Sequence, residues 1–216
     1  KTLKGIADAG YSTPTPIQAS MIPLILAGHD IFGCAQTGTG KTASYVLPIL
    51  NKLEDGRVRV RMPRVLVLTP TRELAQQVQE SAIKYGKHHK IGVACVIGGE
   101  SMMAQEKELN KRVDILIATP GRLIDILERG RVMLNAVELL VIDEADRLLD
   151  MGFVPDVEKI VTFLPATRQT LLLSATASVP IRKLAERFLR DPKEVTVSPE
   201  VMSATTVEQI VMQVPL

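Results

Sequence analysis

Two short motifs carry the residues of this chain that are best suited to chemistry. The first, AQTGTGKT at residues 35–42, can cradle phosphate groups, because glycines leave no Cβ in the way of backbone N–H groups. Lys41 can bring a positive charge to the β- and γ-phosphates, and the Thr42 hydroxyl suits Mg²⁺, which favours hard oxygen ligands. The residues predicted to contact a nucleotide here are Gln36, Thr37, Gly38, Thr39, Gly40, Lys41 and Thr42.

The second motif, VIDEAD at residues 141–146, places two carboxylates directly after an apolar run. A parallel sheet presents magnesium ligands at such strand ends, so this motif can hold the metal and the attacking water. A glycine loop alone could be a chance turn, but the acidic pair Asp143 and Glu144 makes chance a poor explanation of both motifs. Together they predict a chain that binds ATP with Mg²⁺ and is built to hydrolyse it.

The residues around the first motif fit the structure that a phosphate loop needs. Residues 30–34 are apolar enough for a buried strand, and residues 43–52 contain helix formers and apolar residues. Pro48 would either kink this helix or delay its start. A strand, a glycine loop and a helix N-terminus form the context in which the motif binds phosphate.

Apolar, β-branched runs alternate with helical patterns along the chain. This alternation predicts an α/β fold with a mostly parallel central sheet and helices on both faces. The stretch 54–63 is the most loop-like insertion. Besides the strand and helix around the phosphate loop, the expected strands are 65–68, 93–97, 115–118, 139–142, 171–173 and 195–197. The expected helices are 72–87, 101–111, 121–129, 154–163 and 178–188.

In a sheet of this kind, ligands bind outside the carboxyl ends of the strands. Several predicted strand ends carry distinctive residues, so we expect one functional rim built from the loops that follow them. These loops begin after Cys34, Leu68, Ile97, Ala118, Ile142 and Leu173.

The composition is that of a globular protein with a full core. The 216 residues are 46% hydrophobic and 23% charged, which suits one large domain or two small ones. A formal net charge of +2 permits a nucleic-acid partner but does not demand one. The chain has two clusters of basic residues, which we interpret as a solvated loop and a solvated helix end rather than as a binding surface. They consist of Arg57, Arg59, Arg61 and Arg64, and of Lys84, Lys87, His88, His89 and Lys90.

Cysteine usage and hydropathy give expectations about location. Cys34 and Cys95 lie within apolar runs, and buried, reduced thiols there fit a cytoplasmic protein. The histidines and cysteines lack metal-ligand spacing, so no structural metal is expected. No apolar stretch has the length of a membrane span and no signal peptide is visible, so no membrane partner is expected.

A set of short motifs in a fixed order carries a family resemblance. Between Gly10 and Thr176 the chain reads GYSTPTPIQ, AQTGTGKT, PTRELA, GG, TPGR, DEAD and SAT. In this order the motifs resemble the first RecA-like domain of DEAD-box ATP-dependent RNA helicases, in a spelling that looks bacterial. The resemblance implies a RecA-like P-loop domain at residues 1–206, with its Q motif at 10–18. It also implies the start of an interdomain linker at 207–216 and a second RecA-like domain of the same protein.

The resemblance implies roles for the residues that match nucleotide motifs. Tyr11, Thr15 and Gln18 would form the adenine pocket, where the Gln18 amide offers both a donor and an acceptor. Asp143 would join Thr42 at the magnesium ion, partly through water. Glu144 would orient or deprotonate the attacking water, so that the catalytic residues are Lys41, Asp143 and Glu144.

Further roles implied by the resemblance concern RNA and its coupling to ATP. Ser174 and Thr176 would link the two ligands by hydrogen bonding to Asp146. Guanidinium groups, a threonine hydroxyl and exposed backbone amides suit an RNA backbone, including its 2′-OH, without reading base sequence. The matching residues are Pro70, Thr71, Arg72, Gly98, Gly99, Thr119, Gly121 and Arg122.

The expected activity is that of one half of an ATP-dependent RNA helicase, which binds nucleotide and RNA weakly and does not unwind alone. Three alternatives stay open from the residues. A GTPase would need an Asn-Lys-x-Asp element, but residues 110–114 read NKRVD, which is one residue too long. A non-enzymatic scaffold is disfavoured because the phosphate-loop lysine and the acidic pair are intact. Action on DNA is possible, because most of the expected contacts are to phosphates.

Overall fold

The structure is a computed structural model and describes residues 1–55 and 62–197. Predictions for residues 198–216, including the linker, lie outside this part, as do Arg57, Arg59 and Arg61. The described strands form one seven-stranded sheet in the order β3-β4-β2-β5-β6-β1-β7, and every neighbouring pair is parallel. The strands are β1 Ile31–Ala35, β2 Val65–Leu68, β3 Val93–Val96, β4 Ile115–Ala118, β5 Leu139–Ile142, β6 Gln169–Ser174 and β7 Lys193–Val197.

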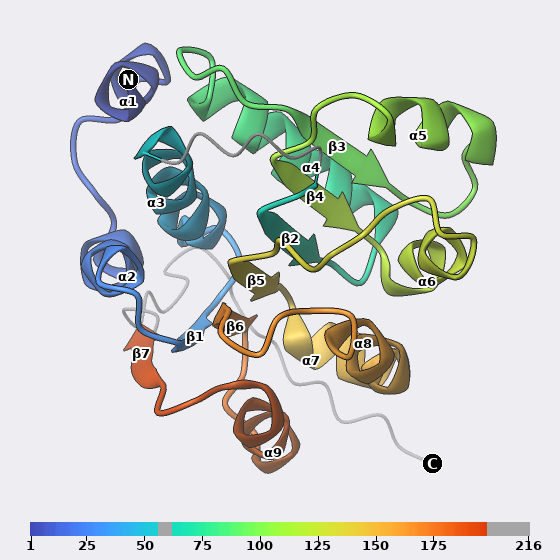
Figure 1. Cartoon of the computed structure of the whole chain (residues 1–216). Helices are drawn as coiled ribbons and strands as arrows, with labels where there is room; N and C mark the ends of the chain where they lie inside the picture. Colours follow the sequence, from blue (N-terminus) through green and yellow to red (C-terminus); the bar gives the residue numbers. More distant parts are fainter. Residues whose placement is uncertain (56–61, 198–216) are drawn as a thin grey trace, which may run out of the picture.

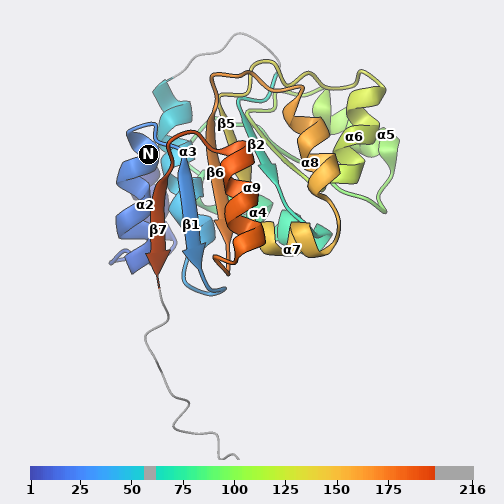
Figure 2. The ribbon, with the colours of Figure 1, turned by 90° about the horizontal axis from the view of Figure 1, so that it is seen from below.

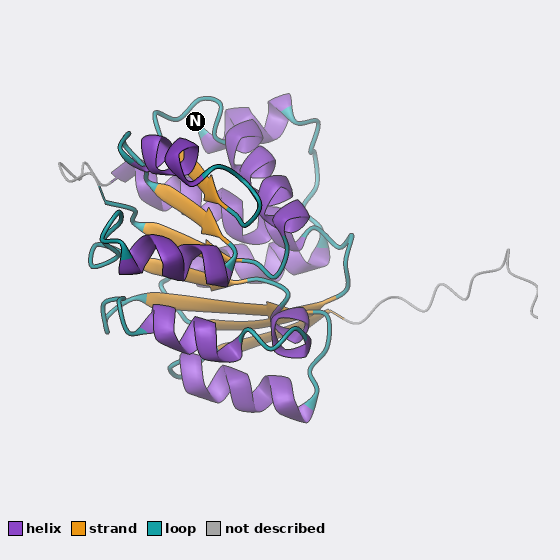
Figure 3. Ribbon diagram, turned by 90° about the vertical axis from the view of Figure 1, so that its right-hand side faces the viewer, coloured by secondary structure: helices purple, strands orange, loops and turns teal. Residues whose placement is uncertain are grey.

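Helices cover both faces of the sheet, as predicted (Figure 1; Figure 3). The first four helices pack on one face of the sheet: α1 Thr2–Asp8, α2 Pro16–Leu26, α3 Lys41–Asp55 and α4 Arg72–Tyr85. The other group packs on the opposite face: α5 Met102–Leu109, α6 Pro120–Glu128, α7 Ala145–Asp150, α8 Val154–Val161 and α9 Val179–Phe188.

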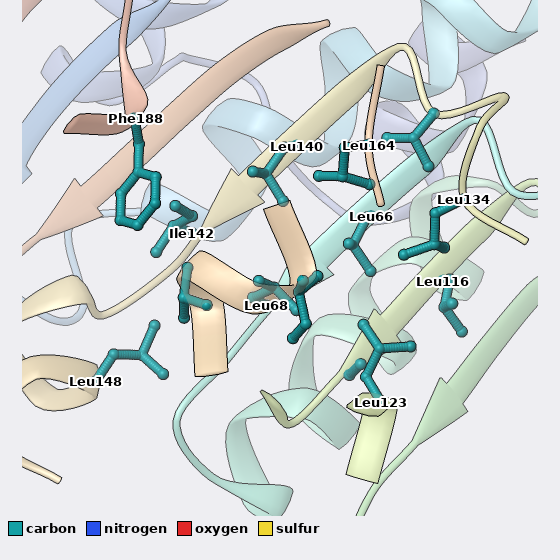
Figure 4. Close-up of a cluster of buried hydrophobic side chains, with 14 of the residues drawn as sticks. Leu66, Leu68, Leu116, Leu123, Leu134, Leu140, Ile142, Leu148, Leu164 and Phe188 are labelled. Carbon is teal, nitrogen blue, oxygen red and sulfur yellow. The ribbon is translucent and has the colours of Figure 1, made fainter. Parts of the chain in front are cut away.

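The sheet separates two apolar cores because successive strand side chains point to opposite faces. In β2, Leu66 and Leu68 join the core beneath α6–α9, whereas Val65 and Val67 join the core beneath α2–α4. Figure 4 shows part of the core beneath α6–α9, with Leu66 and Leu68 among side chains from other strands and helices. All four residues of β2 are buried, which explains why central strands read in the sequence as unbroken apolar runs.

Most predicted elements are confirmed to within a few residues, with two kinds of correction. The helix after the phosphate loop begins at Lys41 and runs through Pro48 to Asp55, which excludes a late start, one of the two effects expected of Pro48. The Ser44 N–H donates to the Gly40 carbonyl (3.1 Å), which continues the loop directly into the helix. Helices α1, α2 and α7 were not predicted.

Helix α2 did carry a sequence signal for its start. Thr15 is its N-cap and Pro16 its first residue, and the Thr15 N–H donates to the Gln18 side-chain oxygen (3.0 Å). A threonine followed three residues later by glutamine is a capping pattern, and proline is favoured at the first position. Pro23 and apolar residues on all sides of the helix obscured the rest of it.

Two further expectations, one about the cysteines and one about a basic cluster, can be compared with the structure. Cys34 is buried, but Cys95 is only half-buried on the edge strand β3. The predicted solvated end of α4 is exposed at Lys84, Lys87 and Lys90, but it also contacts α1: the imidazole Nε2 of His88 lies 2.7 Å from Asp8 Oδ2 and the Lys87 ammonium 3.6 Å from it. Among the described residues, we find no helix with both the length and the apolar character needed to cross a membrane.

Candidate nucleotide and nucleic-acid site

Because all seven strands are parallel, the loops that follow them lie along one edge of the sheet, the predicted rim. In Figure 2 the arrowheads of β7, β1 and β6 point the same way, toward the end where α7 lies. The strand order sorts the rim into two neighbouring groups. We call the loops after β1, β5 and β6 the first loop group, and the loops after β2, β3 and β4 the second loop group. The predicted ATP residues fall on the first group, apart from those of the 10–18 motif, and the predicted RNA residues fall on the second.

The phosphate loop has the backbone that its glycines predicted. Gly38 and Gly40 have φ angles of 82° and 91°, a region that side chains other than glycine rarely adopt. A Cβ at Gly40 would also lie 2.5 Å from the Gln18 side-chain nitrogen. The Thr39 hydroxyl donates to the Gln36 carbonyl (2.7 Å) and closes the turn. Both glycines are therefore required by local geometry.

The Lys41 side chain is the most telling feature of this loop. It is 8% exposed, and its Nζ has no hydrogen-bond partner among the described residues. Burying a charged donor without an acceptor is costly, so this position fits an anion. Lys41 lines a cavity of about 300 Å³ together with other predicted ATP residues, among them Tyr11, Gly38, Thr42, Asp143 and Glu144.

Asp143 is held rigidly at the end of β5. Its carboxylate accepts hydrogen bonds from the Glu144 N–H at Oδ1 (2.9 Å) and from the Tyr45 hydroxyl at Oδ2 (2.8 Å). Burial raises the pKa of Asp143, and the hydrogen bond from Tyr45 and the charge of Lys41 oppose that rise. Tyr45 was missed by sequence reasoning, because only the fold brings residues 45 and 143 together.

Glu144 has an unusual backbone. Its φ and ψ angles are 48° and 54° at the N-cap of α7, the left-handed region that costs a non-glycine residue roughly 1–2 kcal/mol. Such strained residues cluster at functional sites. Its carboxylate lies 3.5 Å from the guanidinium of Arg147 and lines both the 300 Å³ cavity and a larger one of about 450 Å³ beside α7 and α9.

The predicted hydrogen bonds from Ser174 and Thr176 to Asp146 are wrong in their donor. The backbone N–H of Ala175 donates to Asp146 Oδ2 (3.0 Å). The Ser174 hydroxyl oxygen is fully buried and accepts from the Thr176 N–H (3.2 Å). The loop after β6 thus does contact the acidic motif, but through its main chain.

Gln18 links α2 to the phosphate loop. Its side-chain nitrogen donates to the Gly40 carbonyl (3.3 Å) while its oxygen accepts from Thr15, and the residue is 5% exposed. The Gln18 amide retains a second N–H and a second lone pair. These could contact adenine, which stays a prediction. Thr15 Oγ1 is buried without a partner in the described part of the chain. Tyr11 meets Tyr85 of α4, with hydroxyl oxygens 3.2 Å apart.

Backbone hydrogen bonds tie neighbouring loops of the rim together. The Asp143 N–H donates to the Leu68 carbonyl (2.9 Å), and the Thr69 N–H to the Ala118 carbonyl (3.0 Å). The Thr119 N–H donates to the Val96 carbonyl (3.1 Å). The two loop groups therefore join at β2 and β5 through the main chain.

The second loop group brings residues from three strands into contact. Gly99 has a φ angle of 82°, and a Cβ there would lie 2.0 Å from the Arg72 guanidinium. The Arg122 guanidinium donates to the Glu100 carbonyl (3.3 Å). At Gly98 and Gly121, an added Cβ would meet nothing within 4 Å, so the surface there is open to a ligand. Two arginines and two open backbone segments thus share one face.

Other predicted members of this group have local structural roles. The Thr71 hydroxyl accepts from the Leu74 N–H (3.3 Å) and caps α4. Pro70 is buried between β2 and α4, which leaves its side chain little access to a ligand. Thr119 is the N-cap of α6, but its hydroxyl makes no capping bond, and the residue is half-exposed.

Gln105 was also missed by sequence reasoning. The residue is 3% exposed on α5, and its side-chain nitrogen donates to the Ile97 carbonyl (2.8 Å) and to Glu100 Oε2 (3.3 Å). These two acceptors flank Gly98 and Gly99, so the amide clamps the glycine loop at both ends. No sequence signal marks this glutamine, because its partners lie on a loop whose path only the fold defines.

The NKRVD element lies away from the rim. Asn110 is the C-cap of α5, and Asp114 precedes β4 at its amino end, where it accepts from the Gly92 N–H (2.7 Å). The phosphate loop is at the opposite, carboxyl edge of the sheet. This placement removes the element as a guanine-recognition site.

Comparison with known proteins gives a consistent picture. The family model described as "DEAD/DEAH box helicase" matches residues 15–184. The chain is 42% identical to the DEAD-box ATP-dependent RNA helicase RhpA of Helicobacter pylori, over 96% of this chain and 41% of that protein. It is 44% identical to the ATP-dependent RNA helicase DeaD of Mycobacterium tuberculosis, over 99% and 38%. The chain thus spans well under half the length of these curated relatives.

A solved structure shares the fold. The crystal structure of a hypothetical ATP-dependent RNA helicase from Sulfolobus tokodaii matches with a TM-score of 0.82 and 36% sequence identity. The match covers 91% of this chain and 56% of that one. This likeness confirms the predicted RecA-like α/β fold.

Proposed function

The chain belongs to the DEAD/DEAH box helicase family, and we propose that it is the N-terminal, ATP-binding RecA-like domain of an ATP-dependent RNA helicase. The observation that carries the proposal is the buried Lys41 ammonium, which lacks an acceptor among the described residues and shares a cavity with Asp143 and Glu144. A triphosphate would supply the missing acceptor.

The nucleotide and its metal would be held by the first loop group. Residues 36–42 would bind the phosphates, while the Thr42 hydroxyl and Asp143 would serve Mg²⁺, which neutralises charge on the phosphates. Within the described part of the chain, no three His, Cys, Asp or Glu side chains gather to hold a metal. Phosphate oxygens and water would therefore complete the magnesium shell, as is usual for this ion. Glu144 would orient the attacking water.

RNA would lie across the second loop group. Arg72 and Arg122, beside the open backbone at Gly98 and Gly121, can bind phosphates without reading bases. The main-chain bonds that join β2 to β5 and the contact of Ala175 with Asp146 support communication between the two ligands. We further propose that a second RecA-like domain completes both sites in the whole, cytoplasmic protein. Closure of the two domains on ATP and RNA would separate the strands of a duplex.

The proposal is tested in the whole protein and in this chain side by side. The whole protein should hydrolyse ATP faster when RNA is present and separate a short RNA duplex, whereas residues 1–216 alone should do neither. ATP should compete for the site better than GTP, and RNA should stimulate better than DNA of the same sequence at fixed salt. Equal use of GTP, or robust unwinding by residues 1–216 alone, would contradict the proposal.

The clamp on the glycine loop leads to a separate prediction. Replacing Gln105 with Leu should lower the affinity of the chain for single-stranded RNA by about 3–10-fold, the effect of losing one or two hydrogen bonds that order a binding loop. Fluorescence anisotropy of a labelled RNA at low salt measures it. ATP affinity should not change, and Gln76→Leu, an exposed change on α4, should leave RNA binding alone. Unaltered RNA affinity in Gln105→Leu would mean that the loop is ordered without the clamp.

A further inference from the structure

We propose that Tyr45 is a positioning residue of the magnesium site, whose hydroxyl holds the Asp143 carboxylate in the orientation that the metal shell requires. This inference rests on the proposed nucleotide function of the site and assigns a role to a residue outside its sequence motifs. It starts from one contact: the Tyr45 hydroxyl lies 2.8 Å from Asp143 Oδ2, across 98 positions of sequence.

The carboxylate of Asp143 is fixed at both of its oxygens. The Glu144 N–H donates to Oδ1 and the Tyr45 hydroxyl to Oδ2, so the plane of the carboxylate cannot rotate without breaking a hydrogen bond. Each oxygen keeps a second lone pair, which can accept from a metal-bound water. Both residues are buried, Tyr45 at 0% and Asp143 at 2% exposure, where hydrogen bonds are less weakened by solvent.

The position of Tyr45 on α3 ties the carboxylate to the phosphate loop. Tyr45 follows Lys41 by one helical turn, so both side chains project from the same side of the helix. Lys41 begins that helix and lines the cavity that Asp143 also lines. The hydroxyl therefore links α3, which follows the phosphate loop, to the end of β5. Residues that hydrogen-bond to a metal ligand in this way orient it for the metal.

The ring and the hydroxyl of Tyr45 have separable tasks. The ring packs in the core with Val46, Ile49 and Leu50 of the same helix, a task that phenylalanine would also perform. The hydroxyl would be costly to bury if it did not find an acceptor, and its acceptor is the carboxylate. Tyr45→Phe thus removes the positioning contact while keeping the packing.

The experiment measures how Mg²⁺ changes ATP binding by residues 1–216. ATP affinity is determined by calorimetry over a series of Mg²⁺ concentrations and in EDTA. In Tyr45→Phe, the Mg²⁺ concentration that gives half of the affinity gain should rise about 10-fold, the lower end of effects seen for residues behind metal ligands. ATP affinity in EDTA should stay within about twofold. In an Asp143→Asn background, the Tyr45→Phe change should have no further effect on the Mg²⁺ requirement, because the carboxylate that the hydroxyl would position is no longer there.

Ser44→Ala is the matched control. It removes a buried hydroxyl from the neighbouring residue of α3, which donates to the Lys41 carbonyl and does not contact Asp143, and it should leave the Mg²⁺ requirement unchanged. An unchanged requirement in Tyr45→Phe overturns the proposal. So does an equal loss of affinity with and without Mg²⁺, or loss of the folded state in a thermal melt, since either assigns the hydroxyl to packing. If the wild-type chain bound no ATP at all, the proposed function would fail together with this inference.

Discussion

Replacing Lys41 with Ala is expected to lower the affinity of the chain for Mg²⁺·ATP by at least about 100-fold, equivalent to about 2.7 kcal/mol. The buried ammonium is 8% exposed and has no acceptor among the described residues, so the phosphates would be its partner. A charge-assisted hydrogen bond in a water-poor site is among the strongest single contacts in proteins. Calorimetry with ATP in excess Mg²⁺ measures the loss.

The stability of the same variant separates a binding role from a structural one. Because Lys41 has no partner to lose in the described structure, its removal should not lower the melting temperature without nucleotide. Lys52→Ala is the control on the same helix: this ammonium donates to Gln169 (2.9 Å) and to the Ile25 carbonyl (3.3 Å). It lies far from the 300 Å³ cavity. Lys52→Ala should lower the melting temperature and spare ATP binding. If Lys41→Ala still gave the wild-type heat of ATP binding, the assignment of Lys41 to the phosphates would be wrong.

The fold was predictable because its signals are local. Each central strand buries both faces, so Val65–Leu68 and Leu139–Ile142 read as unbroken apolar runs whose bounds the structure confirms. The prediction of a single rim followed from one rule: the carboxyl ends of parallel strands share an edge. Helix α7 escaped prediction because it has only six residues, and α2 because its apolar residues do not follow the amphipathic period by which helices are recognised.

The division of labour along the rim was not predictable, because it depends on strand order. β5 lies between β2 and β6, and β1 lies beyond β6, which gathers the loops for nucleotide on one side. No run of residues specifies that order. The contacts of Tyr45 with Asp143, of Ala175 with Asp146 and of Gln105 with the glycine loop were missed for the same reason. Each joins segments that are far apart in sequence or uses the main chain, which carries no residue-type signal.

Replacing Glu144 with Gln in the whole protein is expected to reduce ATP turnover by about 10²–10⁴-fold, the range for loss of a general base, while ATP binding stays within about threefold. Glutamine has the same length and shape, so the left-handed backbone at φ 48° and the capping of α7 should not change. What it loses is the charge that we propose to orient or deprotonate the attacking water. Phosphate release under saturating ATP and RNA measures turnover, and calorimetry on residues 1–216 measures binding.

The matched control for that change is Glu128→Gln at the end of α6. Glu128 is an exposed carboxylate paired with Lys159, away from both cavities that Glu144 lines. It should affect neither turnover nor binding, because an exposed ion pair contributes about 0–1 kcal/mol to stability. Unlike Glu128, Glu144 has a left-handed backbone and lines both cavities. Turnover that persists in Glu144→Gln would reassign the activation of water to another group, and Asp146, on the same helix and bound by Ala175, would be the first to test.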